Sequence, residues 1–222
     1  MCNLYSQTRN TEAIRNLFKV SGNRAVVFAP MAAILPAGHA PVVRLAEDGE
    51  RELVKMSWGF VHSQPGRTPR RITTARDDEI MTDFWRQSFE QKRCLVPATS
   101  FCEPNSERPT GARATWHWYA LAGDGPRQPF AFAGIWQRHR GPIQKGGPPV
   151  VLEVYSFMTT APNYASINRE RSPVLLTTEA EREIWLLGSP GEARALIRPI
   201  DGDRLRIVQA GPRKGDLLGA TR

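Results

Sequence analysis

The sequence predicts an α+β protein: a single compact domain in which a curved, barrel-like and mostly antiparallel sheet is flanked by helices. Several segments place apolar residues at every second position, which is typical of strands with one buried face. Apolar residues at the spacing of a helix occur only in a few short segments, which lie between and after these predicted strands. No repeat or linker divides the 222 residues, so we expect one domain over residues 1–210 and a loose, Gly- and Lys/Arg-rich tail over residues 211–222.

The predicted strands are recognised by alternation and by their β-branched and aromatic residues. From Leu53 to Phe60, every second side chain is large and apolar, which indicates a strand with a well-buried face. A short buried strand over residues 94–96 should end at Pro97, because proline has no N–H for the sheet ladder. Further strands are predicted over residues 130–136, 150–159 and 205–209.

Four helix starts are predicted from capping residues and apolar spacing. Thr178 and Glu181 form a capping box at the start of one helix. Ser189 and Glu192 form a second capping box, with Pro190 at the first helical position. Two earlier helices are indicated by apolar residues about one turn apart. The four predicted starts are Asn10 or Thr11, Thr82, Thr178 and Ser189.

The basic residues of the chain favour a polyanionic partner. The net charge is +8 and the isoelectric point is near 9.9, which fits either nucleic-acid binding or a plain solvated basic surface. Clustering favours nucleic acid, because arginine forks suit phosphate oxygens and because Trp58 and Phe60 lie just upstream as stacking surfaces. The clustered residues are Arg67, Arg70, Arg71 and Arg76.

The remaining composition limits the classes of protein. The three cysteines are too few and odd in number for a disulfide framework, so we expect reduced thiols. No leader or membrane-spanning stretch is present, and we expect a cytoplasmic protein without a membrane partner. The four histidines show no metal-ligand spacing, and there is no phosphate-binding glycine loop, so we expect no metal and no cofactor.

Cys2 is the residue with the most distinctive chemistry. Removal of Met1 would leave a free α-amine and a thiol on one residue, and both groups are partly nucleophilic near neutral pH. With an aldehyde, the amine forms a Schiff base and the thiol closes onto it to give a thiazolidine. The open form of an abasic deoxyribose presents such an aldehyde. The alternative is an ordinary residue near a frayed terminus.

Six segments of the chain form a recognisable series in order and spacing. They are MCNLYSQTRN at the start, MSWGF at 56–60, TARDD at 74–78, CLVPATSFCEP at 94–104, FAFAGIW at 130–136 and INRERSPVLLT at 167–177. Together they resemble the SOS-response-associated peptidase (SRAP) family, and most closely its branch that begins MCNLYS, from Met1 to about Val208. The resemblance implies a compact α+β domain with a positively charged groove, in a monomer that binds single-stranded DNA and cross-links to abasic sites through Cys2. The protein would associate with the nucleoid when bound to DNA.

The resemblance assigns roles to individual residues. Cys2 matches the family nucleophile, and Glu103 matches the acid that assists proton transfer, although by itself it could be a surface loop acid before a proline. Arg76 matches an arginine on the DNA backbone. Trp58 either borders the groove or packs in the core. The remaining residues expected at the DNA are Arg70, Arg71, Asn3 and Pro36.

Two residues depart from the family pattern at catalytic positions. Thr74 stands where the family commonly has an asparagine, and it keeps a hydroxyl but loses the two-ended amide. Arg169 stands where the family normally has a histidine, and arginine cannot act as a general acid near neutral pH. It could still stabilise negative charge on a sugar or phosphate oxygen. We therefore expect DNA binding to persist and the proton steps to differ, with full loss of the chemistry as the alternative.

Three functions remain open from the sequence. The first is a DNA-damage protein that senses abasic sites and links covalently to them, with a possible lyase activity. The second is a cysteine-type peptidase, a hydrolase acting on its own N-terminus with Glu103 assisting, as the SOS-response family name implies. It would need a base to activate the thiol and an oxyanion hole. The third is a non-covalent single-strand binder. We favour the first.

Overall fold

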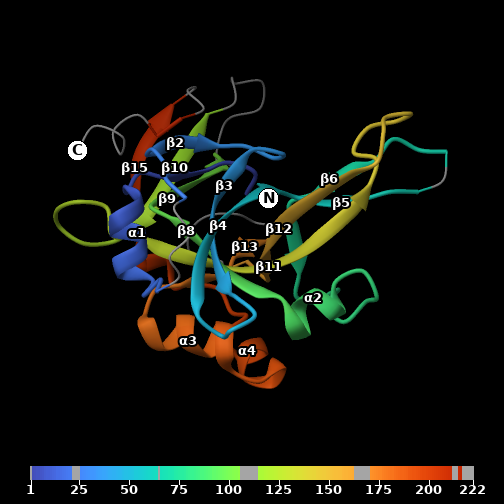
Figure 1. Ribbon diagram of the computed structural model, residues 1–222. Coiled ribbons are helices and arrows are strands. Elements are labelled where there is room, and N and C mark those ends of the chain that lie inside the picture. The colour runs from blue at the N-terminus through green and yellow to red at the C-terminus, as the bar shows by residue number, and fades with distance from the viewer. Residues whose placement is uncertain are drawn as a thin grey trace.

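A computed structural model describes residues 2–21, 26–64, 66–105, 115–162, 171–211 and 215–216. It confirms the predicted α+β class, with a closed, mostly antiparallel ring of strands, a second sheet and few helices. Figure 1 shows a body formed by these layers and an arm that projects from one side of it. Among the described residues, no helix is long and apolar enough to cross a bilayer.

The barrel is a ring of five strands in the order β12-β4-β3-β8-β11, closed by pairing between β11 and β12. Only the β12–β4 pair within this ring is parallel. Three short strands, β7, β13 and β14, extend the ring at its margins. The bounds are β3 (His39–Leu45), β4 (Arg51–Trp58), β7 (Thr74–Arg76), β8 (Arg93–Ala98), β11 (Phe130–Gly141), β12 (Val150–Thr160), β13 (Ser172–Pro173) and β14 (Leu175–Leu176).

The second sheet is antiparallel and has the order β15-β10-β9-β1-β2. The chain passes from the ring into this sheet at Thr99, whose backbone N–H donates to the Ser6 carbonyl at 2.9 Å. This sheet positions the start of the chain, because β1 lies between β2 and β9. The bounds are β1 (Tyr5–Gln7), β2 (Met31–Ile34), β9 (Ser100–Pro104), β10 (Trp116–Leu121) and β15 (Leu205–Gly211).

The alternation of the ring strands separates two apolar cores. On one face, Val43 and Leu95 pack with helix residues such as Trp185. On the other face, Trp58 and Phe132 pack against residues of the second sheet. Adjacent residues of one strand therefore enter different cores, as the period of two requires.

Helices cover the first of these cores, and Figure 1 shows α3 and α4 side by side beneath the ring. Trp185 ties α3 to the ring, because its indole N–H donates to two strand carbonyls at 3.0 and 2.9 Å. The predicted cap at Asn10 is confirmed, as are the capping boxes at Thr178 and Ser189. The bounds are α1 (Thr11–Leu17), α2 (Arg86–Gln91), α3 (Glu179–Leu187), α4 (Pro190–Ala195) and the 3-10 helix η1 (Gly202–Arg204).

Three local predictions are wrong in their boundaries. Helix α2 begins at Arg86 rather than Thr82, because the preceding residues form turns in which the Thr82 hydroxyl bonds the Glu79 carbonyl. Strand β8 continues through Pro97, which is tolerated because the neighbouring strand β3 pairs only with residues 94 and 95. The strand predicted over 53–60 is interrupted at Gly59, whose φ of 102° ends the regular strand.

The arm consists of two hairpins, which we define as residues 60–72 and 137–152. The first contains β5 (Phe60–His62) and β6 (Arg70–Ile72), which form their own two-stranded sheet. The second is the outer part of β11 and β12, which pair as far as Gly141 and Val150. Figure 1 shows both hairpins extending together away from the body.

The described part of the tail is anchored to the body. Asp216 is fully buried, its backbone N–H donates to the Ala32 carbonyl at 2.8 Å, and its carboxylate is ion-paired with Arg127. The Gly215 carbonyl accepts a hydrogen bond from Gln209 of β15 at 2.8 Å. Within the segment that we expected to be loose, these two residues therefore occupy defined positions.

Candidate functional site

Cys2 lies just before β1 and is buried beneath the body surface, with 1% of its area exposed. Its thiol donates to the Leu4 carbonyl at a sulfur–oxygen distance of 3.5 Å. Burial raises the pKa of this thiol well above its ordinary value, and the charge of Glu103 raises it further. The thiol is therefore protonated near neutral pH. The alternative of an unremarkable residue at a frayed end does not fit this burial.

Glu103 is placed beside Cys2 by the pairing of two strands. Tyr5 of β1 lies opposite Phe101 of β9, and the backbone N–H of Cys102 donates to the Leu4 carbonyl at 2.9 Å. Glu103, the next residue of β9, therefore lies beside the residues that precede β1. It is fully buried, which excludes the surface loop acid. Burial and the Glu103 charge also raise the pKa of the Cys102 thiol to about 12. The sequence prediction that these two residues belong together is consistent with this geometry.

A group of aromatic side chains surrounds the thiol and was not foreseen from the sequence. The hydroxyls of Tyr5 and Tyr155 share a hydrogen bond of 2.5 Å, and burial raises the pKa of both. Tyr5 also meets Trp58 edge-on, with ring centroids 5.1 Å apart. The only sequence signal was the position of Tyr5 three residues after Cys2. These rings belong to the same buried cluster as Cys2, so the surroundings of the thiol are largely apolar.

Trp58 belongs to the core rather than to an exposed stacking surface. It has no exposed area and stacks with Phe157 at 5.4 Å and with Tyr155 at 6.4 Å. Its indole N–H donates to the Thr73 carbonyl at 2.9 Å. In this structure Trp58 cannot offer a face to a base, and it instead holds the segment that leads into β7.

Strand β7 is buried at its start and exposed at its end. Thr74, its first residue, is buried and lies beside Phe157 of β12, whereas Arg76, its last residue, is exposed. Arg76 donates two hydrogen bonds to Asp78, at 2.9 and 2.6 Å. The hydrogen bonds from Arg76 lower the pKa of Asp78 to about 2. Arg76 is thus accessible, but a carboxylate occupies its guanidinium fork.

The other expected site residues are distributed around this region. Arg70 and Arg71 lie on the arm, where Arg70 is exposed and Arg71 donates to the Gly59 carbonyl at 2.8 Å. Asn3 is exposed between Cys2 and β1. Pro36 is exposed in the turn before β3, and this turn is tied to the core because Ala37 donates to the Trp58 carbonyl at 2.8 Å. Arg169 lies outside the described residues.

The comparison with known families decides which group this chain belongs to. Residues 1–213 match the family described as SOS response associated peptidase (SRAP). The chain belongs to the SRAP family. The resemblance found in the sequence is thereby confirmed over nearly the whole chain.

Named relatives and solved structures are similar to this chain in sequence or in fold. The chain is 26% identical to "Abasic site processing protein YoqW" of Bacillus subtilis over 76% of its own length and 74% of that protein. It is 28% identical to "Abasic site processing protein YoaM" of the same organism, over 76% and 73%. Crystal structures of proteins from Bordetella bronchiseptica and Bacteroides thetaiotaomicron share its fold. Their TM-scores are 0.71 and 0.70 at 21% identity, and the matches cover 95% and 94% of this chain and 98% and 90% of theirs.

The second sheet contributes polar groups to this SRAP site that sequence patterns did not indicate. His117 of β10 pairs directly with Glu103, so both side chains project from the same face of the sheet. Behind β1, the Asp216 carboxylate accepts hydrogen bonds from Ser6 at 3.1 Å and Ser100 at 2.5 Å. Residues so distant in the chain carry no common motif. Among the described residues, no three His, Cys, Asp or Glu side chains are grouped as a metal site would need.

Proposed function

We propose that this SRAP protein processes abasic sites in DNA by binding a single strand and forming a covalent thiazolidine through Cys2 after removal of Met1. The observation that carries the proposal is a buried thiol at the second residue beside the buried carboxylate of Glu103. The names of the two Bacillus relatives support abasic-site DNA as the substrate. Exposed arginines near the site supply charge for a DNA strand.

The chemistry follows from two nucleophiles on one residue. The free α-amine of Cys2 attacks the aldehyde carbon of the open deoxyribose, and loss of one water gives an imine. The thiol sulfur then bonds to the same carbon, while its proton passes to Glu103 and from there to the imine nitrogen. That nitrogen becomes the N–H of the ring, so no oxidant or further reactant is needed.

The raised pKa of the thiol agrees with this order of events. A cysteine peptidase attacks with a thiolate and needs a thiol of lowered pKa, whereas burial and Glu103 raise the pKa of Cys2. In the proposed reaction the amine attacks first, and the protonated thiol reacts only when Glu103 can accept its proton. The raised pKa therefore supports our proposal of a covalent DNA linkage rather than peptidase activity.

The departures at Thr74 and Arg169 concern sugar positioning and proton transfer. Buried Thr74 can present only a hydroxyl where the family commonly has an amide. Without a histidine at position 169, the proton steps rest on Glu103 in our proposal. Slow ring opening or slow reversal of the bond is the consequence that we expect for this chain.

The direct test mixes the purified protein with a single-stranded oligonucleotide that contains one abasic site. A band that resists heat and detergent on a denaturing gel is the expected result, together with an intact mass that lacks Met1. A sample without Met1 that binds the oligonucleotide on a native gel, yet gives no covalent band, would instead establish a non-covalent binder.

Asp78→Asn should strengthen binding to single-stranded DNA without abasic sites by roughly two- to fivefold, a size typical of exposed charge pairs. Asp78 occupies the fork of Arg76, so neutralising it weakens the competition for the two guanidinium donors, while Glu79 remains 3.5 Å from Nε. Fluorescence anisotropy measures the effect. Asp83→Asn is the matched control, because Asp83 forms a similar exposed pair with Arg86 at 2.8 Å on α2. An equal gain in DNA affinity for both variants would show a general charge effect, and would mean that Arg76 does not contact the DNA backbone.

A further inference from the structure

The arm is the most one-sidedly charged part of the molecule. Its two hairpins, residues 60–72 and 137–152, contain no aspartate or glutamate. One acidic residue just beyond them, Glu153, lies opposite Arg138 in the β11–β12 ladder and is ion-paired with Arg44 of the body at 2.9 Å. The two hairpins contain six arginines and lysines. These residues are Arg67, Arg70, Arg71, Arg138, Arg140 and Lys145.

The charges of the arm are available to a ligand. Five of the six residues are exposed, Arg71 being the partly buried one. Within the described part of the chain, none of the six takes part in an ion pair, whereas Arg44, Arg51 and Arg76 of the body are all paired with carboxylates. Such unpaired basic side chains at the end of a projecting element are suited to an external anion.

An open hollow of about 480 Å³ lies between the tips of the two hairpins. Arg67 lines it from the first hairpin and Lys145 from the second. The remaining lining is uncharged and combines prolines with the amides of Gln64 and Gln144, which can donate hydrogen bonds. The two cations and two amides supply hydrogen-bond donors for a phosphodiester group.

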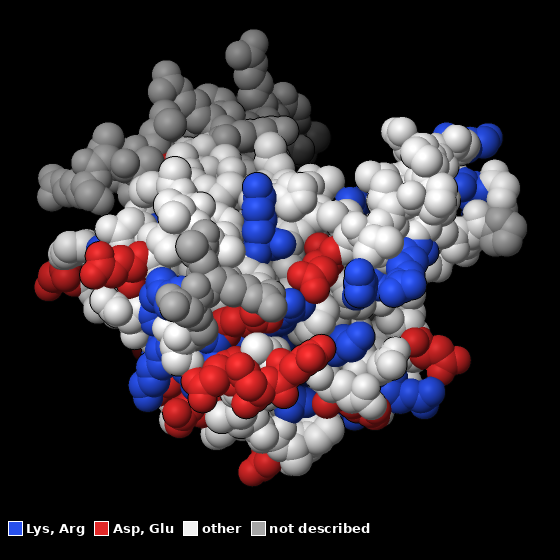
Figure 2. Space-filling model, in the orientation of Figure 1, with Lys and Arg blue, Asp and Glu red and all other residues white. Residues whose placement is uncertain are grey.

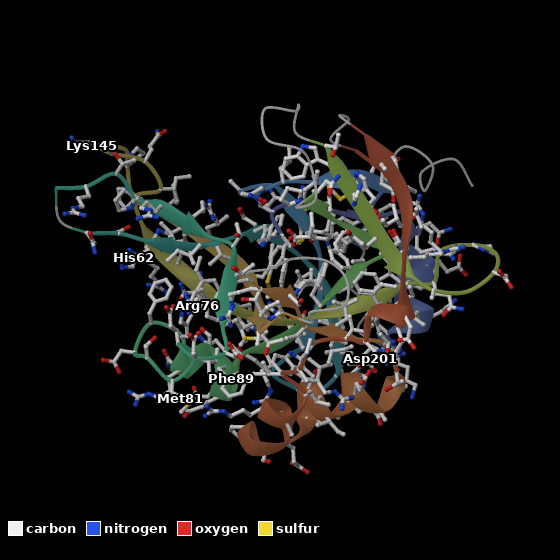
Figure 3. All side chains as sticks on the ribbon, turned by 180° about the vertical axis from the view of Figure 1, so that it is seen from behind. His62, Arg76, Met81, Phe89, Lys145 and Asp201 are labelled. Carbon is white, nitrogen blue, oxygen red and sulfur yellow. The ribbon has the colours of Figure 1, made fainter. Side chains whose placement is uncertain are left out.

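The arm is continuous with the candidate site. Strand β12 pairs with β7 near its inner end, which places Arg76, and with β11 at its outer end, which forms the arm. Figure 3 places Arg76 where the arm joins the body, His62 farther out and Lys145 at the tip. Figure 2 shows basic side chains at the tip and along the side of the arm that faces α2. A single DNA strand on this course would pass from Arg76, whose neighbours include Asp78 and Glu79, to the unpaired basic side chains of the arm.

We propose that the arm binds the phosphate backbone of the single DNA strand that continues beyond the abasic nucleotide. This inference rests on the proposed function and extends its footprint from Arg76 to the hairpin tips. The contacts are to phosphates, so they add affinity without base preference. Short DNA strands that end at the body would not reach the hairpin tips. The affinity for single-stranded DNA should therefore increase with the length of the DNA strand.

The test uses Arg67→Gln combined with Lys145→Gln, which removes the two charges that line the hollow. The matched control is Arg194→Gln with Arg204→Gln, which removes two exposed charges from α4 and η1 outside the arm. Anisotropy is measured with intact single strands of about 6 and about 20 nucleotides, lengths that bracket common single-strand sites. The wild-type covalent band on a short abasic oligonucleotide reports the proposed function separately.

The arm variant should bind the long strand roughly tenfold more weakly at about 0.1 M salt, with a salt slope shallower by about 1.4. The short strand should lose much less affinity, and the control should lose little on either. Equal losses for both strands, or equal losses for arm and control variants, would overturn the inference. An absent wild-type covalent band with a length-dependent loss would reject the proposed chemistry while retaining the arm as a backbone-binding element.

Discussion

Cys2→Ala should abolish the heat-stable covalent band, lowering its yield by at least roughly a hundredfold, while binding to intact single-stranded DNA persists. Alanine is also small enough for Met1 to be removed, so the α-amine remains and only the thiol is lost. That amine can still form an imine with the abasic aldehyde. Borohydride added to the mixture should therefore restore a covalent band for the variant by reducing the imine.

This pair of measurements separates the two nucleophiles of Cys2. Cys94→Ala is the matched control, because Cys94 is also fully buried but lies in ring strand β8. It should retain the band without borohydride. A stable band that survives Cys2→Ala in the absence of reductant would show that another nucleophile attacks the sugar, and the thiazolidine would have to be abandoned.

Glu103→Gln should slow cross-linking by roughly a hundredfold or more, the contribution typical of a positioned acid or base. The amide has the shape of the carboxylate but cannot accept the thiol proton. The substitution also removes a charge that raises the pKa of Cys2, so the pKa of the thiol should fall. Single-turnover rates measured from about pH 6 to about pH 10 test both effects, because this range spans the ordinary pKa values of an α-amine and a thiol and approaches the raised pKa of Cys2 from below.

The two roles of Glu103 predict opposite signs at neutral pH. If its charge acted only on the thiol, Glu103→Gln would increase the thiolate fraction and accelerate the reaction. If Glu103 accepts the thiol proton of Cys2, Glu103→Gln reacts more slowly than the wild type. Its rate then rises with pH, because the thiol must lose its proton to the solvent instead. Glu103→Asp keeps the carboxylate and should recover part of the rate. Thermal unfolding is a useful control, because burying a neutral amide in place of a charge should not lower stability.

Much of the fold could be predicted because local rules determine it. The capping boxes at Thr178 and Ser189 are satisfied within one turn of chain, so their helices begin where the sequence indicates. Boundaries that depend on neighbours were wrong. Pro97 remains in a strand because its neighbour β3 stops pairing earlier, and Gly59 breaks a strand whose alternation is otherwise regular. The strands that were not predicted have short or irregular patterns and become strands only through pairing. They are β1, β2, β3, β5, β6, β7, β9, β10, β13 and β14.

The candidate site could be predicted only in part. Cys2, Glu103 and Arg76 were named from motifs that resemble the SRAP family, yet nothing in the chain order shows that Cys2 and Glu103 are neighbours. The sequence left two positions possible for Trp58, at the border of a groove or in the core. Its burial against Phe157 in the structure places it in the core. The two hydrogen bonds from the Arg76 guanidinium to the Asp78 carboxylate depend on how the chain turns after β7.

The sequence by itself determined the α+β class, the family and the basic character of the chain, because motifs and charge are properties of residue order. It also singled out Cys2, the nucleophile of our proposal. The tertiary structure decided which groups act on one another. It buries the Cys2 thiol beside Glu103, which raises the pKa of that thiol, and it joins two hairpins that are far apart in the chain into one basic arm. Burial and electrostatic coupling depend on distances through space, and strand pairing between remote segments sets those distances.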